Sequence, residues 1–371
     1  MIEQEQIEQT KIKVPKFAYV FFGIAILSLI IFIIAIVSPP FADFFNRYVS
    51  SIFRGTLATL TNILPISLAE LIIILSPVAL FFIIRFAIKK YGSSWRSVGV
   101  FSITVLSVIT LLFSSFVLTF GTGYHTSPLD KKLELDKKEV KAIELAQTAE
   151  WLIGEVNASL HAIEFKPESS SVNPHTIRET NNILLDSYKS LSEKYDFLPR
   201  LVSYAKPIML SKPMTYTHIS GIYTYFTGES NVNTNAPDYS IPYTMAHELA
   251  HQRGIAREDE ANFIAFLVCV NADDPYVKYC GYMNLCEYVL NALYDADQTL
   301  WKETYKKLDN RAVYEMFAYN KFYEKYKDNV VGEVSGAIND AYLQANGTEG
   351  TKSYGLVVDL AVAYFHKEIE N

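Results

Sequence analysis

Three long apolar runs dominate the first third of the chain. They cover about residues 17–38, 68–88 and 98–120, and the first and third contain no charged side chain. A helix needs about 20 predominantly apolar residues to cross a hydrocarbon core, so each run is long enough to span a membrane. A diproline follows the first run where a signal peptide would have small residues for cleavage. The sequence therefore predicts a membrane domain over residues 1–124 with three transmembrane helices.

The basic residues around these runs predict their orientation. Two groups flank the start of the first run and the loop between the second and third runs: Lys11, Lys13 and Lys16, and Lys89, Lys90 and Arg96. The loop between the first and second runs carries only two basic residues. Because Lys and Arg are enriched in cytoplasmic loops, we expect a multi-pass protein of the cell membrane with a cytoplasmic N-terminus. Residues 125–371 are then expected outside the cytoplasm.

The pattern changes to that of a water-exposed region after residue 124. Apolar residues recur at helical spacing over 136–160, over 177–195 and from 241 to the end. Between 198 and 233, prolines, glycines and alternating aromatic residues predict one or two short strands or a hairpin. The expected fold is mainly α. Three N-terminal transmembrane helices precede a predominantly helical α+β domain with a small strand or hairpin element.

Composition and charge exclude two broad classes of protein. Half of the residues are hydrophobic and 20% are charged, which excludes an intrinsically disordered chain. The 33 Lys and Arg against 40 Asp and Glu give a net charge of −7. This balance removes the general electrostatic case for binding nucleic acid. The lipid bilayer is the first partner that we expect, and no nucleic acid is expected.

The clearest catalytic signature is the sequence HELAH at residues 247–251. On a helix, His247 and His251 are four residues apart and share one face, so both imidazoles can bind one ion. Two imidazoles and a carboxylate, with one open position for water, suit Zn²⁺. Glu248 lies beside them and can take a proton from a metal-bound water. Pro242 in the first turn and Gly254 after the last turn support a helix here.

A second acidic and then apolar stretch, AREDEANFIAFLVC, follows Gly254 and offers a third ligand. Glu258 and Glu260 both lie at its start, but two residues on a helix differ by about 200°, so only one can face the metal. Asn262 is four residues after Glu258 and shares its face, where it could hydrogen-bond a metal-binding imidazole. This spacing favours Glu258, and Glu260 remains the alternative.

The longer sequence HELAHQRGIAREDEANFIAFL, the segment GIYTYFTGESNVN upstream and the three N-terminal runs together resemble a known family. This is the membrane-anchored bacterial family called domain of unknown function 3810, which is grouped with the gluzincin-like metallopeptidases. The resemblance implies a zincin-like metallopeptidase domain over residues 125–371 and brings no known substrate. Carried over by motif, His247 and His251 are zinc ligands, Glu248 is the general base, and Glu258 is the third ligand.

The upstream segment has an expected place in such a domain. Zincin clefts usually have a strand edge above the metal-binding helix, where an extended peptide adds by backbone pairing. Tyr223, Thr224, Tyr225 and Phe226 are candidates for that edge, and Glu229 is a candidate for its rim. The alternative is an ordinary buried hairpin with a polar turn.

Two functional classes remain. The first is a membrane-tethered zinc metallopeptidase that hydrolyses peptide or cell-envelope protein bonds through a metal-bound water activated by Glu248. The second is a non-catalytic membrane sensor or scaffold that retains a zincin-like domain. The intact HELAH favours the first, because a retired site has no chemical reason to keep Glu248. Cleavage inside the membrane is disfavoured, since HELAH begins well over a hundred residues after the last apolar run.

Overall fold

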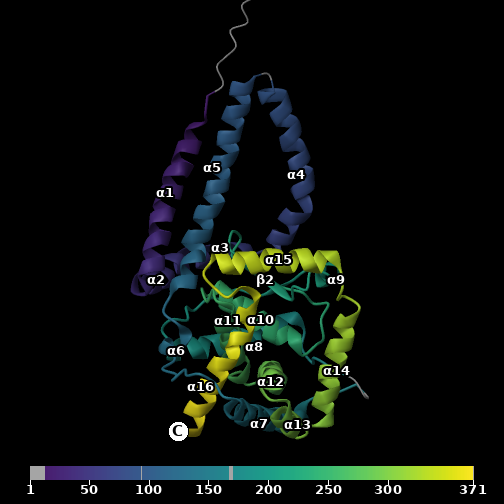
Figure 1. The fold of residues 1–371 in the computed structure, drawn as a ribbon. Helices are drawn as coiled ribbons and strands as arrows, with labels where there is room; N and C mark the ends of the chain where they lie inside the picture. The colour runs from purple at the N-terminus through teal and green to yellow at the C-terminus, as the bar shows by residue number, and fades with distance from the viewer. Residues whose placement is uncertain (1–12, 93, 167–169, 371) are drawn as a thin grey trace, which may run out of the picture.

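The computed structural model describes residues 13–92, 94–166 and 170–370. Lys11, one of the basic residues used to predict orientation, lies outside these ranges. Long helices project from one side of a mainly helical region (Figure 1). This region begins in the sequence directly after the third long helix.

The three predicted apolar helices are confirmed. They are α1 (Lys16–Val37), α4 (Leu68–Tyr91) and α5 (Trp95–Thr119), and each is long and apolar enough to cross a membrane. The start of α1 and the turn between α4 and α5 lie at the end that points away from the helical region (Figure 1). Their apolar side chains remain largely exposed, most completely on α4. Exposure of this kind indicates that the protein associates with a membrane.

Short helices connect α1 to α4 and pack against the helical region. They are α2 (Pro39–Phe44), the π-helical turn η1 (Phe45–Ser50) and α3 (Ser51–Thr61). Arg54 of α3 is fully buried, and its guanidinium donates to the side-chain oxygen of Asn46 and to the backbone carbonyls of Thr119 and Arg253. One buried cation therefore joins the end of α5 to the loop that follows the HELAH helix.

The helical region contains the remaining helices, with helical turns between some of them. In chain order they are η2 (Gly121–His125), α6 (Leu129–Lys132), α7 (Ala142–Ser159), η3 (Leu160–Ala162), α8 (Ile177–Lys194), α9 (Ser211–Thr215), α10 (Ser240–Gln252), α11 (Glu258–Val270), α12 (Pro275–Ala296), α13 (Gln298–Tyr305), α14 (Asn310–Glu324), α15 (Val330–Ala345), η4 (Gly350–Leu356) and α16 (Val357–Glu370). The helix predicted over 136–160 begins later than expected, and the helix predicted over 177–195 is confirmed as α8.

The predicted hairpin is also confirmed. Strands β2 (Gly221–Thr224) and β3 (Glu229–Val232) are antiparallel, and Gly228 takes a positive φ of 71° in the turn between them. The short strand β1 (Lys206–Pro207) pairs in parallel with β3, so the strand order is β1-β3-β2. Strand β2 is therefore at the edge of this small sheet.

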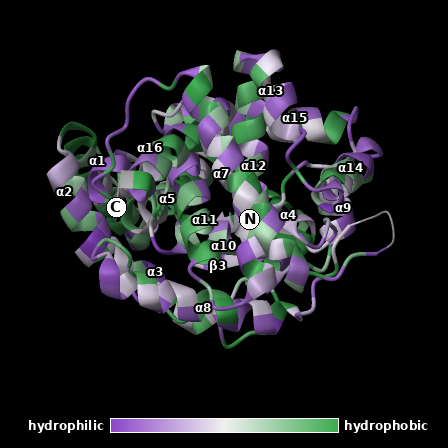
Figure 2. Ribbon diagram, turned by 90° about the horizontal axis from the view of Figure 1, so that it is seen from below, coloured by the Kyte–Doolittle hydropathy of each residue, from purple (hydrophilic) through white to green (hydrophobic). Residues whose placement is uncertain are grey.

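The main hydrophobic core is built around α10, α11 and α12. Its buried residues come from segments between Leu129 and Ala363. Residues 258–269 of α11 are all buried, so this helix is surrounded on every side. Viewed from below, α10 and α11 lie near the middle of the molecule, with α3, α8, α13 and α14 toward its periphery (Figure 2). The HELAH helix therefore lies within the main core and packs against a helix that is itself buried.

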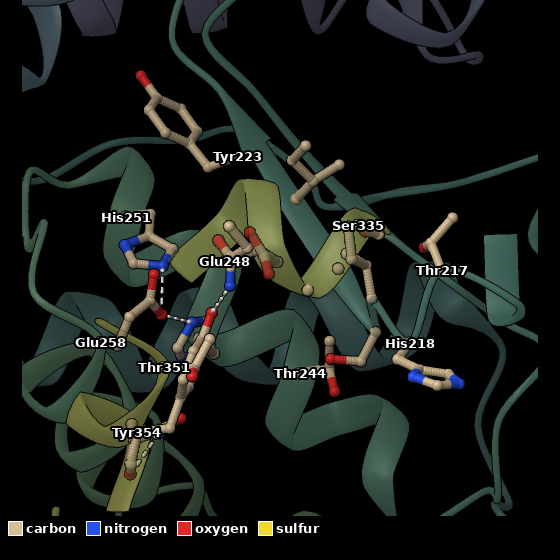
Figure 3. A pocket seen from close by; sticks show the side chains of 18 of the residues that line it. Thr217, His218, Tyr223, Thr244, Glu248, His251, Glu258, Ser335, Thr351 and Tyr354 are labelled. Atoms are coloured by element: carbon tan, nitrogen blue, oxygen red, sulfur yellow. Dashed lines mark hydrogen bonds and ion pairs between the residues drawn. The ribbon is translucent and has the colours of Figure 1, made fainter. Parts of the chain in front are cut away.

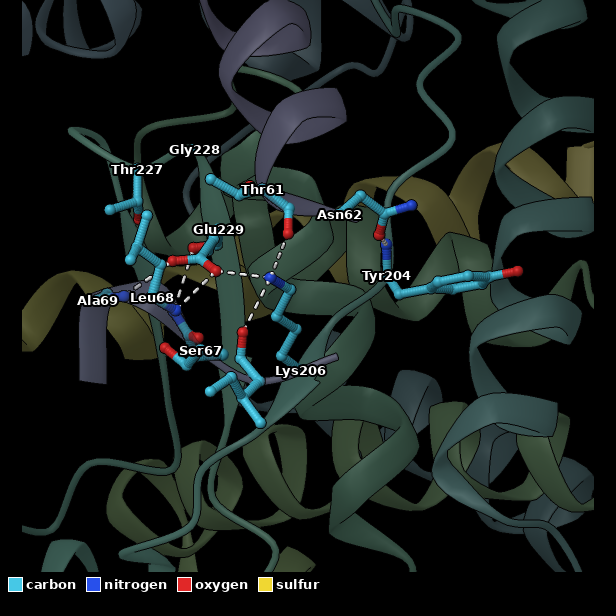
Figure 4. A network of polar contacts seen from close by, with 12 residues as sticks. Thr61, Asn62, Ser67, Leu68, Ala69, Tyr204, Lys206, Thr227, Gly228 and Glu229 are labelled. Atoms are coloured by element: carbon cyan, nitrogen blue, oxygen red, sulfur yellow. Dashed lines mark hydrogen bonds and ion pairs between the residues drawn. The ribbon is translucent and has the colours of Figure 1, made fainter. Parts of the chain in front are cut away.

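A buried ion pair holds the start of α4 against the sheet (Figure 4). Lys206 Nζ lies 2.6 Å from Glu229 Oε1 and also donates to the carbonyls of Thr61 and Ile66. The Glu229 carboxylate accepts the backbone N–H groups of Leu68 and Ala69, both at 2.9 Å. These amides are in the first turn of α4, where a carboxylate is favoured by the helix dipole.

Candidate metal centre

The HELAH residues lie on α10, whose position is fixed from both sides. Pro242 is in the first turn, and the chain leaves the helix through Gly254, which has a φ of 92°. The Ser230 hydroxyl of β3 donates to the Glu248 carbonyl at 2.8 Å, and the Tyr243 hydroxyl donates to the Asn262 carbonyl of α11. The sheet and the second helix therefore hold α10 along the segment that carries the motif.

His247, His251 and Glu258 converge at one point. Figure 3 shows two of them, His251 and Glu258, side by side, with Glu248 nearby. Glu258 Oε2 lies 3.1 Å from His247 Nε2 and 3.3 Å from His251 Nε2. One ligand atom from each residue lies within 4.8 Å of the other two, and all three residues are largely buried. Two imidazole nitrogens and a carboxylate oxygen are therefore close enough to bind a single ion.

His251 is held in the orientation that such binding requires. Its Nδ1 lies 2.7 Å from the carbonyl oxygen of Ile255. A carbonyl can only accept, so Nδ1 carries the proton and Nε2 is left free to face the cluster. The turn at Gly254 brings this carbonyl back toward the helix, which the sequence pattern alone did not reveal.

The electrostatics of the cluster keep its carboxylate ionised. Burial alone would raise the pKa of Glu258, but the neighbouring His251 and His247 hold it well below its ordinary value. Burial lowers the pKa of His251, yet the Glu258 carboxylate more than offsets this and raises it to about 9. The buried anion thus attracts positive charge, which protons or a metal cation can supply.

Glu248 stands beside the cluster as a buried carboxyl group with one free oxygen. Its Oε2 is buried without a hydrogen-bond partner, and its carboxylate takes a hydrogen bond from the backbone of Tyr223. Burial raises the pKa of Glu248 to about 7, although His247 and His251 act in the opposite direction. A carboxyl group with a pKa in this range can both accept and return a proton near neutral pH.

The two candidates for the third ligand, Glu258 and Glu260 of α11, point toward different parts of the structure. Glu260 is also buried, but its Oε1 accepts the backbone N–H of Leu129 at 2.9 Å and lies 3.7 Å from Arg257 Nε. It therefore faces the start of α6, while Glu258 faces the imidazoles. The structure brings Glu258, and not Glu260, to the histidine pair.

The expected hydrogen bond from Asn262 to an imidazole is absent. The Asn262 side-chain amide donates to the Tyr354 carbonyl at 3.3 Å and to the Tyr288 hydroxyl at 3.4 Å. One turn beyond Glu258, this amide lies level with η4 and α12, which supply the acceptors. His247 Nδ1 is buried without a hydrogen-bond partner.

A cavity of about 600 Å³ lies over the cluster. The predicted edge residues Tyr223, Thr224, Tyr225 and Phe226 all contribute to its lining, along with Gly221 and Ile222. The prediction for Glu229 is wrong, because this residue is not at the rim. It is 1% exposed and is held by Lys206 and the start of α4.

Tyrosines from several elements surround the cluster. Those that line the cavity and lie near Glu258 are Tyr124, Tyr288, Tyr342 and Tyr354. For Tyr288 on α12 the helical spacing favours core packing over a role in stabilising an oxyanion, and no sequence pattern indicates the others. Burial and the charges of Glu258 and Glu248 raise the pKa of Tyr354, whose hydroxyl accepts from the Asn339 amide at 3.4 Å. A neutral phenol beside both carboxylates is a hydrogen-bond donor in reach of the same cavity.

The chain matches a protein family over most of its length. Residues 45–362 match the family described as Protein of unknown function (DUF3810). No curated protein and no solved structure matches the chain. The matched segment begins in η1 and ends in α16, so it includes α4, α5 and all residues of the cluster. The chain therefore belongs to the DUF3810 family, whose function is unknown.

Proposed function

We propose that this protein is a membrane-tethered, zinc-dependent metallopeptidase with a zincin-like domain. The observation that carries the proposal is the convergence of His247, His251 and Glu258 within 4.8 Å, beside the unpaired carboxylate oxygen of Glu248. Two nitrogen ligands and one carboxylate, with a further position left open, form the ligand set of hydrolytic zinc sites.

The residues present fit a zinc ion on three counts. The ligand types are those that Zn²⁺ prefers, and the Ile255 carbonyl already fixes His251 in the tautomer that exposes Nε2. Glu258 stays ionised despite its burial, as a ligand must. The two imidazoles compensate this buried anion here, and a metal cation bound at the same point would take over that role from their protons.

The chemistry assigns separate tasks to the side chains around the cavity. When bound, zinc supplies a Lewis acid that polarises a peptide carbonyl and makes a water more acidic. Glu248 takes the proton of the attacking water with its free oxygen and returns it to the leaving amine. Tyr354 donates a hydrogen bond to the oxygen on which negative charge develops.

The substrate class that this cavity favours is an extended polypeptide, such as a peptide or a cell-envelope protein. Strand β2 is at the edge of its sheet and its residues line the cavity. An edge strand offers backbone N–H and C=O groups with which an extended chain can pair. Backbone pairing would align successive peptide bonds above α10.

We also propose that the protein is multi-pass, with a cytoplasmic N-terminus and an extracytoplasmic helical region. Lys89, Lys90 and Arg96 surround the α4–α5 turn, at the end of the apolar helices that points away from the helical region (Figure 1). Basic residues are enriched on the cytoplasmic side, so this end is assigned to the cytoplasm.

The proposal is tested by comparing cleavage products in membranes that contain the wild type, Glu248→Gln or the control Glu303→Gln. Glu303 is an exposed residue of α13, so its substitution makes the same chemical change away from the site. We expect peptide ends that appear with the wild type and Glu303→Gln and disappear with Glu248→Gln. Identical peptide ends in all three samples would contradict the proposal and favour a non-catalytic sensor or scaffold.

A further inference from the structure

Helix α15 carries an apolar face that no other described part of the chain covers. Its outward apolar residues fall within a sector of about 120° around the helix axis: Val330, Val331, Val334, Ala337, Ile338, Ala341 and Ala345. The exposed fractions of the four largest are 72%, 56%, 53% and 65% in chain order, and all seven residues are exposed. The acidic residues Glu333 and Asp340 lie outside this sector. The helix is therefore amphipathic, with its apolar side turned outward.

The other side of α15 borders the cavity. Gly332, Ser335, Gly336, Asn339 and Tyr342 contribute to the cavity lining. At Gly332 the helix approaches closely enough that a Cβ atom would meet the ring of His218. Packing over the cavity thus fixes the rotation of α15, and the apolar sector cannot turn inward.

The C-terminal half of α15 lies against the end of α5. The Tyr342 ring is 6.2 Å from the ring of Phe116, which is in the last turn of α5. The Tyr124 hydroxyl, just after α5, donates to the Tyr342 hydroxyl at 3.2 Å. This half of α15 is therefore at the level where the third apolar helix ends.

The N-terminal end of α15 is held at the corresponding level near α4. Tyr326, shortly before α15, packs its ring 4.9 Å from that of Tyr216, the residue after α9. The amides of Met209 and Leu210, directly before α9, donate to the Glu70 carboxylate in the first turn of α4. Figure 1 shows the result, with α15 lying across the top of the helical region and transverse to the long apolar helices.

We infer that α15 is an interfacial helix whose apolar sector lies in the surface of the bilayer that α1, α4 and α5 cross. The apolar sector of α15 lies at the same height as the ends of those helices that adjoin the helical region (Figure 1). An amphipathic helix in the membrane interface buries its apolar side about 5–10 Å deep, at the boundary of headgroups and acyl chains. Helix α15 contains no Lys or Arg, so the contact is hydrophobic and does not depend on anionic lipid.

This contact bears on the substrate of the proposed peptidase. Because α15 covers one side of the cavity, its insertion places the cavity about one helix diameter, roughly 10 Å, from the lipid surface. Resting on the proposed function, the substrate class narrows to polypeptide segments that emerge from the membrane surface. The lipid contact itself requires neither zinc nor catalysis, so its test is independent of the proposed peptidase activity.

The test places a nitroxide label on the full-length protein in phosphatidylcholine nanodiscs that hold one chain each. Val334→Cys and Ile338→Cys carry the label within the apolar sector, and Glu333→Cys carries it on the same helix outside the sector. Lys302→Cys on α13, at the far end of the helical region, gives the aqueous reference (Figure 1). The labelled unsubstituted chain corrects for Cys269, Cys280 and Cys286, which are all buried.

We expect the labels at 334 and 338 to collide preferentially with oxygen, which partitions into lipid, and to be shielded from a water-soluble nickel chelate. The labels at 333 and 302 should show the reverse preference, and adding anionic lipid should leave the pattern unchanged. Equal chelate access at 334, 338 and 302 would overturn the inference. Shielding that is absent with one chain per disc and present with two would also overturn it, in favour of contact between two copies.

Discussion

The buried pair of Lys206 and Glu229 should contribute far more to stability than an exposed pair of the same geometry. Lys206 Nζ and Glu229 Oε1 are 2.6 Å apart, with side chains only 6% and 1% exposed. Arg200 and Glu193 form a matched pair at 2.7 Å, but their side chains are 63% and 56% exposed. Replacing Lys206 by Met leaves a buried carboxylate without its cation and two carbonyls, those of Thr61 and Ile66, without this donor.

The size of the effect follows from this burial. Removing one partner of a buried pair costs about 3–5 kcal/mol, whereas an exposed pair contributes about 0–1 kcal/mol. For a region of this size, 1 kcal/mol moves the unfolding midpoint by about 2–4 °C. Lys206→Met should therefore lower the midpoint by roughly 6–20 °C. The lower half of this range is expected, because Glu229 keeps its hydrogen bonds from the α4 amides.

Thermal unfolding of the purified full-length protein, followed by near-ultraviolet circular dichroism in one detergent, measures this difference. Arg200→Met is the control and should lower the midpoint by at most about 4 °C. Lys206→Met/Glu229→Gln should recover part of the loss, since it removes the uncompensated charge. A loss in Lys206→Met no larger than in Arg200→Met would refute the reasoning that burial makes this pair important.

Three further results are expected. In a chelator competition assay, Glu258→Ala should weaken zinc binding by more than the roughly 10–100-fold cost of losing an outer hydrogen-bond partner, while Glu260→Ala should have a mild effect; the reverse ranking would transfer the ligand role to Glu260. Tyr354→Phe should retain zinc and lower kcat for peptide hydrolysis by about 10²–10³-fold, the usual cost of losing a donor to an oxyanion; unchanged kcat would remove Tyr354 from the mechanism. A reporter that is active only in the cytoplasm should work when fused in the α4–α5 turn and fail when fused to the C-terminus, and activity of the C-terminal fusion would overturn the orientation.

The features predictable from the sequence were those that depend on local patterns. Uninterrupted apolar runs identified α1, α4 and α5, because hydropathy over about 20 residues needs no tertiary information. The spacing of His247 and His251 indicated that they share a helix face, and α10 places them so. The turn residues around Gly228 predicted the β2–β3 hairpin for the same local reason.

The features that escaped prediction depend on contacts between distant segments. Glu229 is in a polar turn sequence that is typical of a rim, but its partners Lys206, Leu68 and Ala69 lie 23 to 161 residues away. Glu260 accepts a hydrogen bond from the Leu129 amide, and this partner cannot be predicted from helical spacing. The tyrosines around Glu258 come from separate elements and belong to no motif. The positions of the Glu229 and Glu260 carboxylates are therefore set by hydrogen bonds to residues far away in the sequence.

The metal content of the purified protein tests the central claim most directly. Elemental analysis by mass spectrometry, on chain purified in zinc-containing buffer and then freed of excess metal, should find about one zinc per chain in the wild type. Glu248→Gln should retain this zinc, because Glu248 is placed as a base and not as a ligand. His247→Ala/His251→Ala should contain essentially none. Stoichiometric zinc in the double variant, or none in the wild type, would contradict the assignment of His247, His251 and Glu258 as a zinc site.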